Sequence, residues 1–208
     1  PALADARALK AQGLDALLLP VTAYSTLGWF DDPLFSGMLD RDDAELSSTV
    51  IHEIAHATVW IDGDAEFNES LAQWVGDQGA VDYFLAKGGE DHPALQEART
   101  SKADSRVFNE AIGELVEDLA RVYESCGMRS QKIAYKHEAV QRFRERYTSE
   151  LKATLSDDTY DWVLDERLEL NNALLLTFRR YHGDEGLFRG LHEQLGGSLR
   201  DTVKALVR

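Results

Sequence analysis

Two long helical patterns separated by only three residues limit how this chain can fold. Apolar residues recur at helical spacing over residues 40–61 and again over residues 65–89, with "DGD" at 62–64 between them. Acidic residues are concentrated at the start of the first pattern, as is typical of a helix N-terminus. Two consecutive glycines end the second pattern, as is typical of a helix C-terminus. Trp60 and Trp74 fall at core spacing and are expected to pack. A turn this short predicts a helical hairpin in which the second helix returns beside the first.

Helical patterns cover most of the remaining chain as well. They span residues 2–13, 93–125, 129–153, 160–181, 186–194 and 198–207. "DALLLPV" at 15–21 predicts one short strand at an edge or an end, because Pro20 cannot donate a backbone hydrogen bond. The Gly- and Pro-containing residues 22–37 predict an irregular loop. With no repeat or linker, residues 1–208 are expected to form a single, mostly α-helical domain of α+β type with little β-strand.

Composition excludes several classes of protein. The 208 residues carry a net charge of −15, from 37 acidic and 22 basic side chains. Nucleic acid is therefore not an expected partner, because phosphate binding needs a basic face. Cys126 is the only cysteine, which excludes an intrachain disulfide and a thiolate metal cluster. No apolar run approaches the roughly 18 to 20 residues that a transmembrane helix needs, so no transmembrane segment is expected.

The most specific motif is HExxH, formed by His52, Glu53 and His56. Residues four apart lie about 40° apart around a helix, so both imidazoles can reach one ion. Glu53 lies about 100° from His52, where it can act as general base on the water that the metal activates. A shuffled chain of this composition would contain the motif roughly 0.014 times. The alternative, two histidines lining a core, requires burial of two uncompensated imidazoles, which is costly.

A catalytic zinc site needs a third protein ligand, and the sequence offers two candidates. Asp62 follows His56 by six residues, but that route needs a glycine at position 59, where this chain has Val59. Glu69 would be brought back beside the histidines by the helical hairpin. "NESLA" at 68–72 resembles the NExxA motif of gluzincins, zinc peptidases with a glutamate as third ligand, although an exposed first-turn glutamate is the alternative. We therefore expect one Zn2+ ion held by His52, His56 and Glu69, with Asn68 as a supporting or capping residue.

These motifs, together with "AYSTLGWFDDP", "FNESLAQWVGDQGA" and "ELNNALLLTFRRYH", resemble the bacterial predicted-aminopeptidase family of zinc peptidases. The resemblance extends over roughly residues 10–200. It implies a zincin-like metallopeptidase fold with the HExxH helix packed on the helix of the glutamate ligand. It also implies one catalytic zinc, a peptide substrate, and a place in the bacterial cell envelope or periplasm, often as a lipoprotein. Family members usually carry a substantial N-terminal region, so we expect such a segment to be missing from this chain.

Further residues are candidates for supporting roles in this site. Tyr181 and His182 match the family's C-terminal motif and are candidates for donors to the developing oxyanion, with a packed helix end as the alternative. Asn171 and Asn172 either brace the site or tie two helices together. Residues 24–30 either wall the substrate cleft or form a surface turn.

The implied function is a zinc-dependent peptidase that hydrolyses peptide bonds with a metal-activated water, and the family label favours an aminopeptidase. An aminopeptidase needs a carboxylate to hold the substrate's ammonium group, for which Asp31, Asp32 and Glu66 are candidates. A turn or helix-start role is the alternative for each of them. A zinc endopeptidase with the same mechanism and a non-catalytic zinc-binding scaffold remain the alternative functions.

Overall fold

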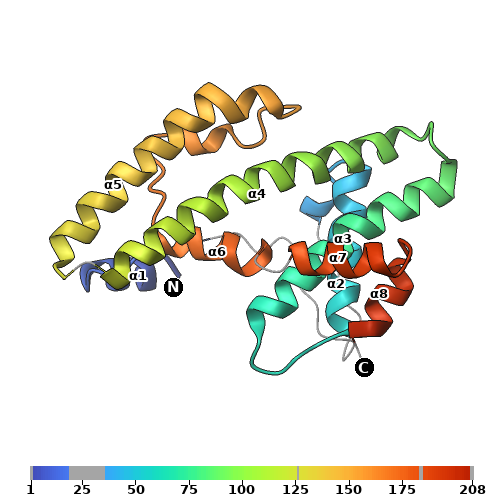
Figure 1. Cartoon of the computed structure of the whole chain (residues 1–208), viewed down its shortest axis with the longest axis horizontal. Coiled ribbons are helices and arrows are strands. Elements are labelled where there is room, and N and C mark those ends of the chain that lie inside the picture. The colour runs from blue at the N-terminus through green and yellow to red at the C-terminus, as the bar shows by residue number, and fades with distance from the viewer. Residues whose placement is uncertain (1, 19–35, 126, 183–184, 207–208) are drawn as a thin grey trace. The chain divides into compact units, whose positions relative to one another are not determined.

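The structure, a computed structural model, describes residues 2–18, 36–125, 127–182 and 185–206 (Figure 1). Most of these residues are helical and none of them forms a strand, so the predicted mostly α-helical class is confirmed. The chain divides into two compact units, Pro1–Leu19 with Ala103–Arg179 and Pro20–Lys102 with Arg180–Arg208. Among the described residues, no helix combines the length and the apolar character that crossing a membrane requires.

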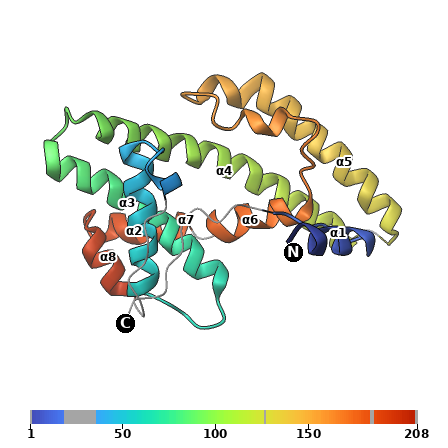
Figure 2. The same ribbon diagram turned by 180° about the vertical axis from the view of Figure 1, so that it is seen from behind.

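The unit Pro20–Lys102 with Arg180–Arg208 contains the predicted helical hairpin. Its helices are α2 (Asp43–Thr58), α3 (Ala65–Gly88), α7 (Glu185–Gln194) and α8 (Leu199–Leu206), with the short helix η1 (Ser36–Met38) and the start of α4 (Pro93–Ser125). The helices α2 and α3 pack along one another, and α7 and α8 both contact α3 (Figures 1 and 2). Buried apolar side chains from α2, α3 and α7 form a core that includes Ala55, Leu71, Trp74, Val75 and Phe188.

Polar residues define where the two hairpin helices begin. The side chain of Asp42 accepts a hydrogen bond from the backbone N–H of Glu45 at 2.7 Å, and that of Asp64 accepts one from Phe67 at 3.0 Å. Each aspartate thereby satisfies a backbone donor that has no partner within its helix. Gly89 ends α3 with a φ of 72°, a conformation that suits glycine.

The first helix ends at Thr58, so the prediction that it continues to Ile61 is wrong. The cause is Asn68, whose side chain is 2% exposed. Its amide nitrogen donates to the Ile61 carbonyl at 2.7 Å, and its amide oxygen accepts from the Ile61 N–H at 2.8 Å. Val59 is extended, with a φ of −133°. Because one buried side chain satisfies both backbone groups of Ile61, the chain turns here instead of remaining helical.

The unit Pro1–Leu19 with Ala103–Arg179 has its own core. It contains α1 (Ala2–Ala11), the rest of α4, α5 (Arg129–Arg146) and most of α6 (Asn172–His182). Between α5 and α6 lie a π-helical turn, Tyr147–Leu151, and two short 3-10 helices, Lys152–Thr154 and Asp161–Leu164. Fully buried Phe108, Ile112, Tyr147 and Val163 form the centre of the core.

The predicted continuous helix over residues 160–181 is wrong, because residues 165–171 are not helical. Arg144 explains the break. Its guanidinium donates to the backbone carbonyls of Val163, Asp165 and Leu168 at 2.8, 3.2 and 3.0 Å. These carbonyls therefore have a side-chain partner in place of the helical one, which hydrophobic periodicity does not reveal.

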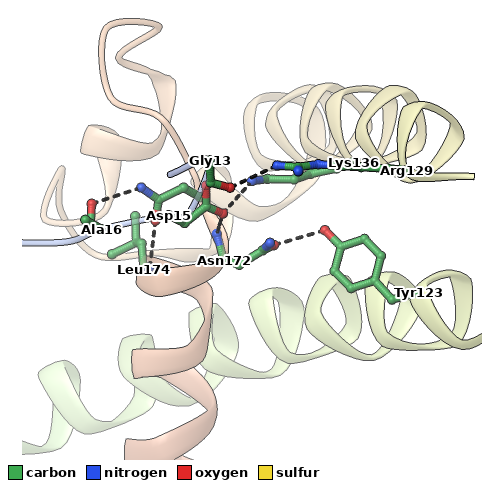
Figure 3. Close-up of polar contacts among 9 residues, drawn as sticks. Gly13, Asp15, Ala16, Tyr123, Arg129, Lys136, Asn172 and Leu174 are labelled. Atoms are coloured by element: carbon green, nitrogen blue, oxygen red, sulfur yellow. Dashed lines mark hydrogen bonds and ion pairs between the residues drawn. The ribbon is translucent and has the colours of Figure 1, made fainter. Parts of the chain in front are cut away.

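The predicted strand at 15–21 is wrong over its described residues, 15–18, which lie outside any sheet. Side chains bind this segment instead (Figure 3). Asp15 accepts from the Asn172 backbone N–H at 2.8 Å and from Lys136 at 3.1 Å, while Asn171 donates to the Ala16 carbonyl at 3.3 Å. The side chain of Asn172 accepts from Tyr123 at 2.9 Å. Asn171 and Asn172 thus connect separate elements, which is the second of their two predicted roles. The rest of the predicted strand, residues 19–21, and residues 22–35 of the predicted loop lie outside the described residues.

Replacing Asp15 is expected to destabilise the protein in a pH-dependent way. Burial alone would raise the pKa of Asp15, but the Asn172 N–H, Lys136 and Lys10 together lower it below its ordinary value. Asp15→Asn should cost about 1–2 kcal/mol in the free energy of unfolding at neutral pH. Because the pKa of this carboxyl is lower in the folded state, its charge stabilises the folded protein at pH values above the unfolded-state pKa of about 3.9. The stability difference between the wild type and Asp15→Asn should therefore shrink as the pH falls through the folded-state pKa.

Urea unfolding of both proteins between neutral and acidic pH measures this effect. The exposed Asp91 provides the control, since Asp91→Asn should change stability by less than about 0.5 kcal/mol. A loss in Asp15→Asn that stays constant across the pH range would contradict the assigned role of the charge.

Candidate metal centre

The three side chains predicted as metal ligands lie together between α2 and α3. The Nε2 atoms of His52 and His56 are 3.1 Å apart, and each lies 3.6 Å from Oε2 of Glu69. His56 is only 7% exposed, while His52 and Glu69 are partly buried. Among the described residues, these three form a group that could hold a metal ion.

The spacing of the three atoms fits a tetrahedral divalent ion. Ligand atoms about 2.0–2.1 Å from a tetrahedral zinc lie roughly 3.3–3.4 Å from one another, close to the separations seen here. Two imidazole nitrogens and one carboxylate oxygen are also a ligand set that suits zinc. The residues present therefore fit such an ion in both number and chemistry.

Electrostatics keep the glutamate of this group ionised. Burial alone would raise the pKa of Glu69, but hydrogen bonding to His52 and His56 lowers it well below its ordinary value. A carboxylate must be deprotonated to bind a metal. Glu69 is therefore in the required form across the physiological range.

Glycines on α3 allow the two helices to approach closely at this point. A methyl group on Gly76 would lie 2.7 Å from the backbone oxygen of Ser48 and 3.3 Å from Cβ of His52. One on Gly79 would lie 2.8 Å from Cγ2 of Ile51. Glu69 precedes Gly76 by about two helical turns and so shares its face. The absence of side chains at positions 76 and 79 thus lets α2 press against the face that carries Glu69.

The two tryptophans of the hairpin have different environments. Trp74 is 4% exposed, as predicted for a packing residue, whereas Trp60 is 46% exposed. Its position beyond the end of α2 explains this difference, because Trp60 no longer follows the helical spacing. The ring of Trp60 contacts that of His56 edge to face, with centroids 5.6 Å apart. Nδ1 of His56 is buried with no hydrogen-bond partner among the described residues, so packing orients this ring.

Other predicted residues are placed only in part. Glu53 follows His52 on α2 and is partly buried, as is Glu66 in the first turn of α3. Asp62 is exposed in the turn and does not belong to the three-residue group. Tyr181 and His182 end α6, but their side chains lie outside the described part of the structure. Residues 24–30, Asp31 and Asp32 also lie outside it.

Sequence patterns did not single out Asp77, which lies on α3 near the group. It accepts hydrogen bonds from Ser48 of α2 at 2.8 Å and from Gln73 of α3 at 3.0 Å. Its spacing four residues after Gln73 is the only local signal, and such pairs are common on helix surfaces. The contact with Ser48 depends on how the two helices pack and is invisible in either segment alone.

One comparison with known proteins identifies relatives of this chain. The sequence model of a family described as "Putative aminopeptidase" matches residues 1–208. No curated protein and no solved structure matches the chain.

Enlarging Gly76 should separate the two helices. Gly76→Ala is expected to reduce the free energy of unfolding by about 1–3 kcal/mol, because its methyl group has no room against the Ser48 backbone. It should also weaken metal binding, since the methyl group meets Cβ of His52. Thermal unfolding and a zinc titration measure the two effects.

Gly113, in α4, is a matched control because nothing lies within 4 Å of the position that a methyl group would occupy. Gly113→Ala should stabilise the protein by about 0.5–1 kcal/mol, as expected for a helix interior. Equal responses of the two variants would show that close helix contact at Gly76 does not matter.

Proposed function

The chain belongs to the putative aminopeptidase family, and from this premise we propose that it is a zinc-dependent peptidase of the gluzincin type. The observation that carries the proposal is the meeting of three donor atoms from His52, His56 and Glu69 within 3.1–3.6 Å of one another. The packing of the HExxH helix on the helix that carries Glu69 supports a zincin-like arrangement. The family supports peptide bonds as the bonds cleaved.

Each residue of the site has a defined chemical task in this proposal. When bound, the zinc ion acidifies a water molecule and polarises the peptide carbonyl. The two neutral imidazoles of His52 and His56 and the ionised Glu69 would hold the ion. A carboxylate oxygen of Glu53 takes a proton from the attacking water and passes it to the leaving amine nitrogen. The water's oxygen thus bonds to the carbonyl carbon while the C–N bond breaks, and the amine departs neutral.

Two parts of the proposal rest on the family resemblance alone. Tyr181 and His182 are proposed as donors to the oxyanion that forms during attack. A location in the bacterial cell envelope is proposed for the same reason.

A scaffold that holds zinc without catalysis is the competing function. Structural zinc sites are closed by four protein ligands, whereas catalytic sites use three and keep a position open for water. The group found among the described residues has three members. This count favours the enzyme.

Zinc titration and peptide hydrolysis together test the proposal. Metal-free protein should bind one equivalent of zinc, and His56→Ala should weaken binding by more than about 100-fold, a larger loss than removal of a supporting residue causes. The exposed His137 on α5 is the control, because His137→Ala should bind zinc as the wild type does.

Glu53→Gln should retain zinc yet lose about 10²–10⁴-fold in hydrolysis rate. Equal rates for Glu53→Gln and wild type would favour the scaffold instead.

We propose aminopeptidase rather than endopeptidase action, on the basis of the family. An aminopeptidase holds the substrate's terminal ammonium group with a carboxylate, so acetylation of that amine should abolish cleavage of a peptide that is otherwise turned over. Mass spectrometry of the products of the free and acetylated peptide measures this. Internal cleavage of the acetylated peptide at a comparable rate would assign endopeptidase action and leave the zinc mechanism intact.

A further inference from the structure

The carboxylate of Asp77 links α3 to α2 beside the candidate metal centre. One oxygen, Oδ1, accepts a hydrogen bond from Ser48 at 2.8 Å and another from Gln73 at 3.0 Å. Ser48 precedes His52 by one turn, so the two residues share a face of α2. The link to Ser48 therefore joins α3 to the part of α2 that carries the first histidine.

Two basic side chains, Lys102 and His52, influence the carboxyl group of Asp77. Burial raises the pKa of Asp77 above its ordinary value, although hydrogen bonds from Gln73 and Ser48 and the charges of Lys102 and His52 oppose this effect. Lys102 is itself partly buried, and burial lowers its pKa against the influence of Asp77, Glu185 and Asp82. Removing a charged carboxylate from water costs free energy, which its hydrogen bonds and nearby positive charges must offset.

The close contact at Gly76 adds a second constraint on the same turn of α2. Gly76 precedes Asp77 and lies against the Ser48 backbone and Cβ of His52. Backbone packing thus stops α2 from moving nearer to α3, and the Ser48–Asp77 hydrogen bond stops it from moving away. Together they leave His52 little freedom relative to Glu69.

We propose that Asp77 is a positioning residue for the metal centre, holding His52 in place through Ser48 and contributing negative charge beside that ligand. The inference rests on the proposed zinc function. Groups that orient a metal ligand typically change metal affinity by 10–100-fold when they are removed. Asp77 would therefore affect zinc affinity without being a ligand.

Asp82 offers a closely matched control on the same helix. It accepts a hydrogen bond from Gln78 at 2.8 Å, four residues earlier, just as Asp77 does from Gln73. Both carboxylates also influence Lys102. Asp82 lies about 140° around the axis of α3 from Asp77, and its bond to Gln78 stays within α3. The two residues differ in the link to α2 that the proposal concerns.

Zinc affinity measured by competition with a chromophoric chelator tests the proposal on the full chain. Asp77→Asn should weaken zinc binding by about 10-fold, and Asp77→Ala by more, because alanine removes both the charge and the link. Ser48→Ala should weaken binding by a smaller factor, and Asp82→Asn should stay within about twofold of the wild type. The absorption spectrum of bound Co2+, which reports ligand geometry, should change in Asp77→Ala and Ser48→Ala, which lose the link between the helices, and not in Asp82→Asn.

The possible results distinguish failure of this inference from failure of the proposed function. Wild-type protein that binds no zinc would overturn both. Zinc binding by the wild type with an unchanged affinity in folded Asp77→Asn would overturn the inference alone. Equal losses of zinc affinity in Asp77→Asn and Asp82→Asn would also overturn the inference, because they would indicate a general effect of charge. If Asp77→Ala does not fold, Asp77→Asn and Ser48→Ala provide the test.

Discussion

Backbone contact between α2 and α3 at Gly76 is the constraint on which the candidate site depends. With no side chain at position 76, the backbone of Ser48 and Cβ of His52 rest directly against α3. This approach determines how far Glu69, two turns earlier on the same face, lies from the histidines. Two imidazoles and a carboxylate can then meet within a few ångströms. Helices separated by ordinary side chains lie 8–10 Å apart, and Gly79 extends the close contact by another turn towards Ile51.

Hydrogen bonds hold α2 and α3 together at two places, one at the turn between them and one beside Gly76. At the turn, the buried amide of Asn68, the residue before Glu69, pairs with both backbone groups of Ile61 and so joins α3 to the segment that follows α2. Further along, the Ser48–Asp77 bond joins the helices one turn from His52. Buried hydrogen bonds are directional and costly to leave unmade, so they select one register where apolar packing alone would tolerate several. A metal site requires this because its ligand atoms must meet to within a few tenths of an ångström.

Side-chain contacts with the backbone also explain where helical periodicity misleads. Arg144 binds three backbone carbonyls within the predicted helix at 160–181, and Asn171 binds the carbonyl of Ala16 within the predicted strand at 15–21. Apolar spacing reports which residues favour burial and contains nothing about such partners. In each case the competing bond comes from a residue at least 19 positions away, so no local window of sequence includes it.

The sequence by itself determined the helical class of the chain, because apolar periodicity is a local property of each segment. It also determined that His52 and His56 share a face, since four residues make about one turn, and it favoured Glu69 through the short hairpin turn and the NESLA motif. Only the tertiary structure decided how the three donor atoms meet, that Trp60 is exposed against His56, and that Asp77 reaches α2 through Ser48. These features depend on the distance and register between two helices. Both are set by Gly76 and Asn68, whose effects appear only when the helices are packed.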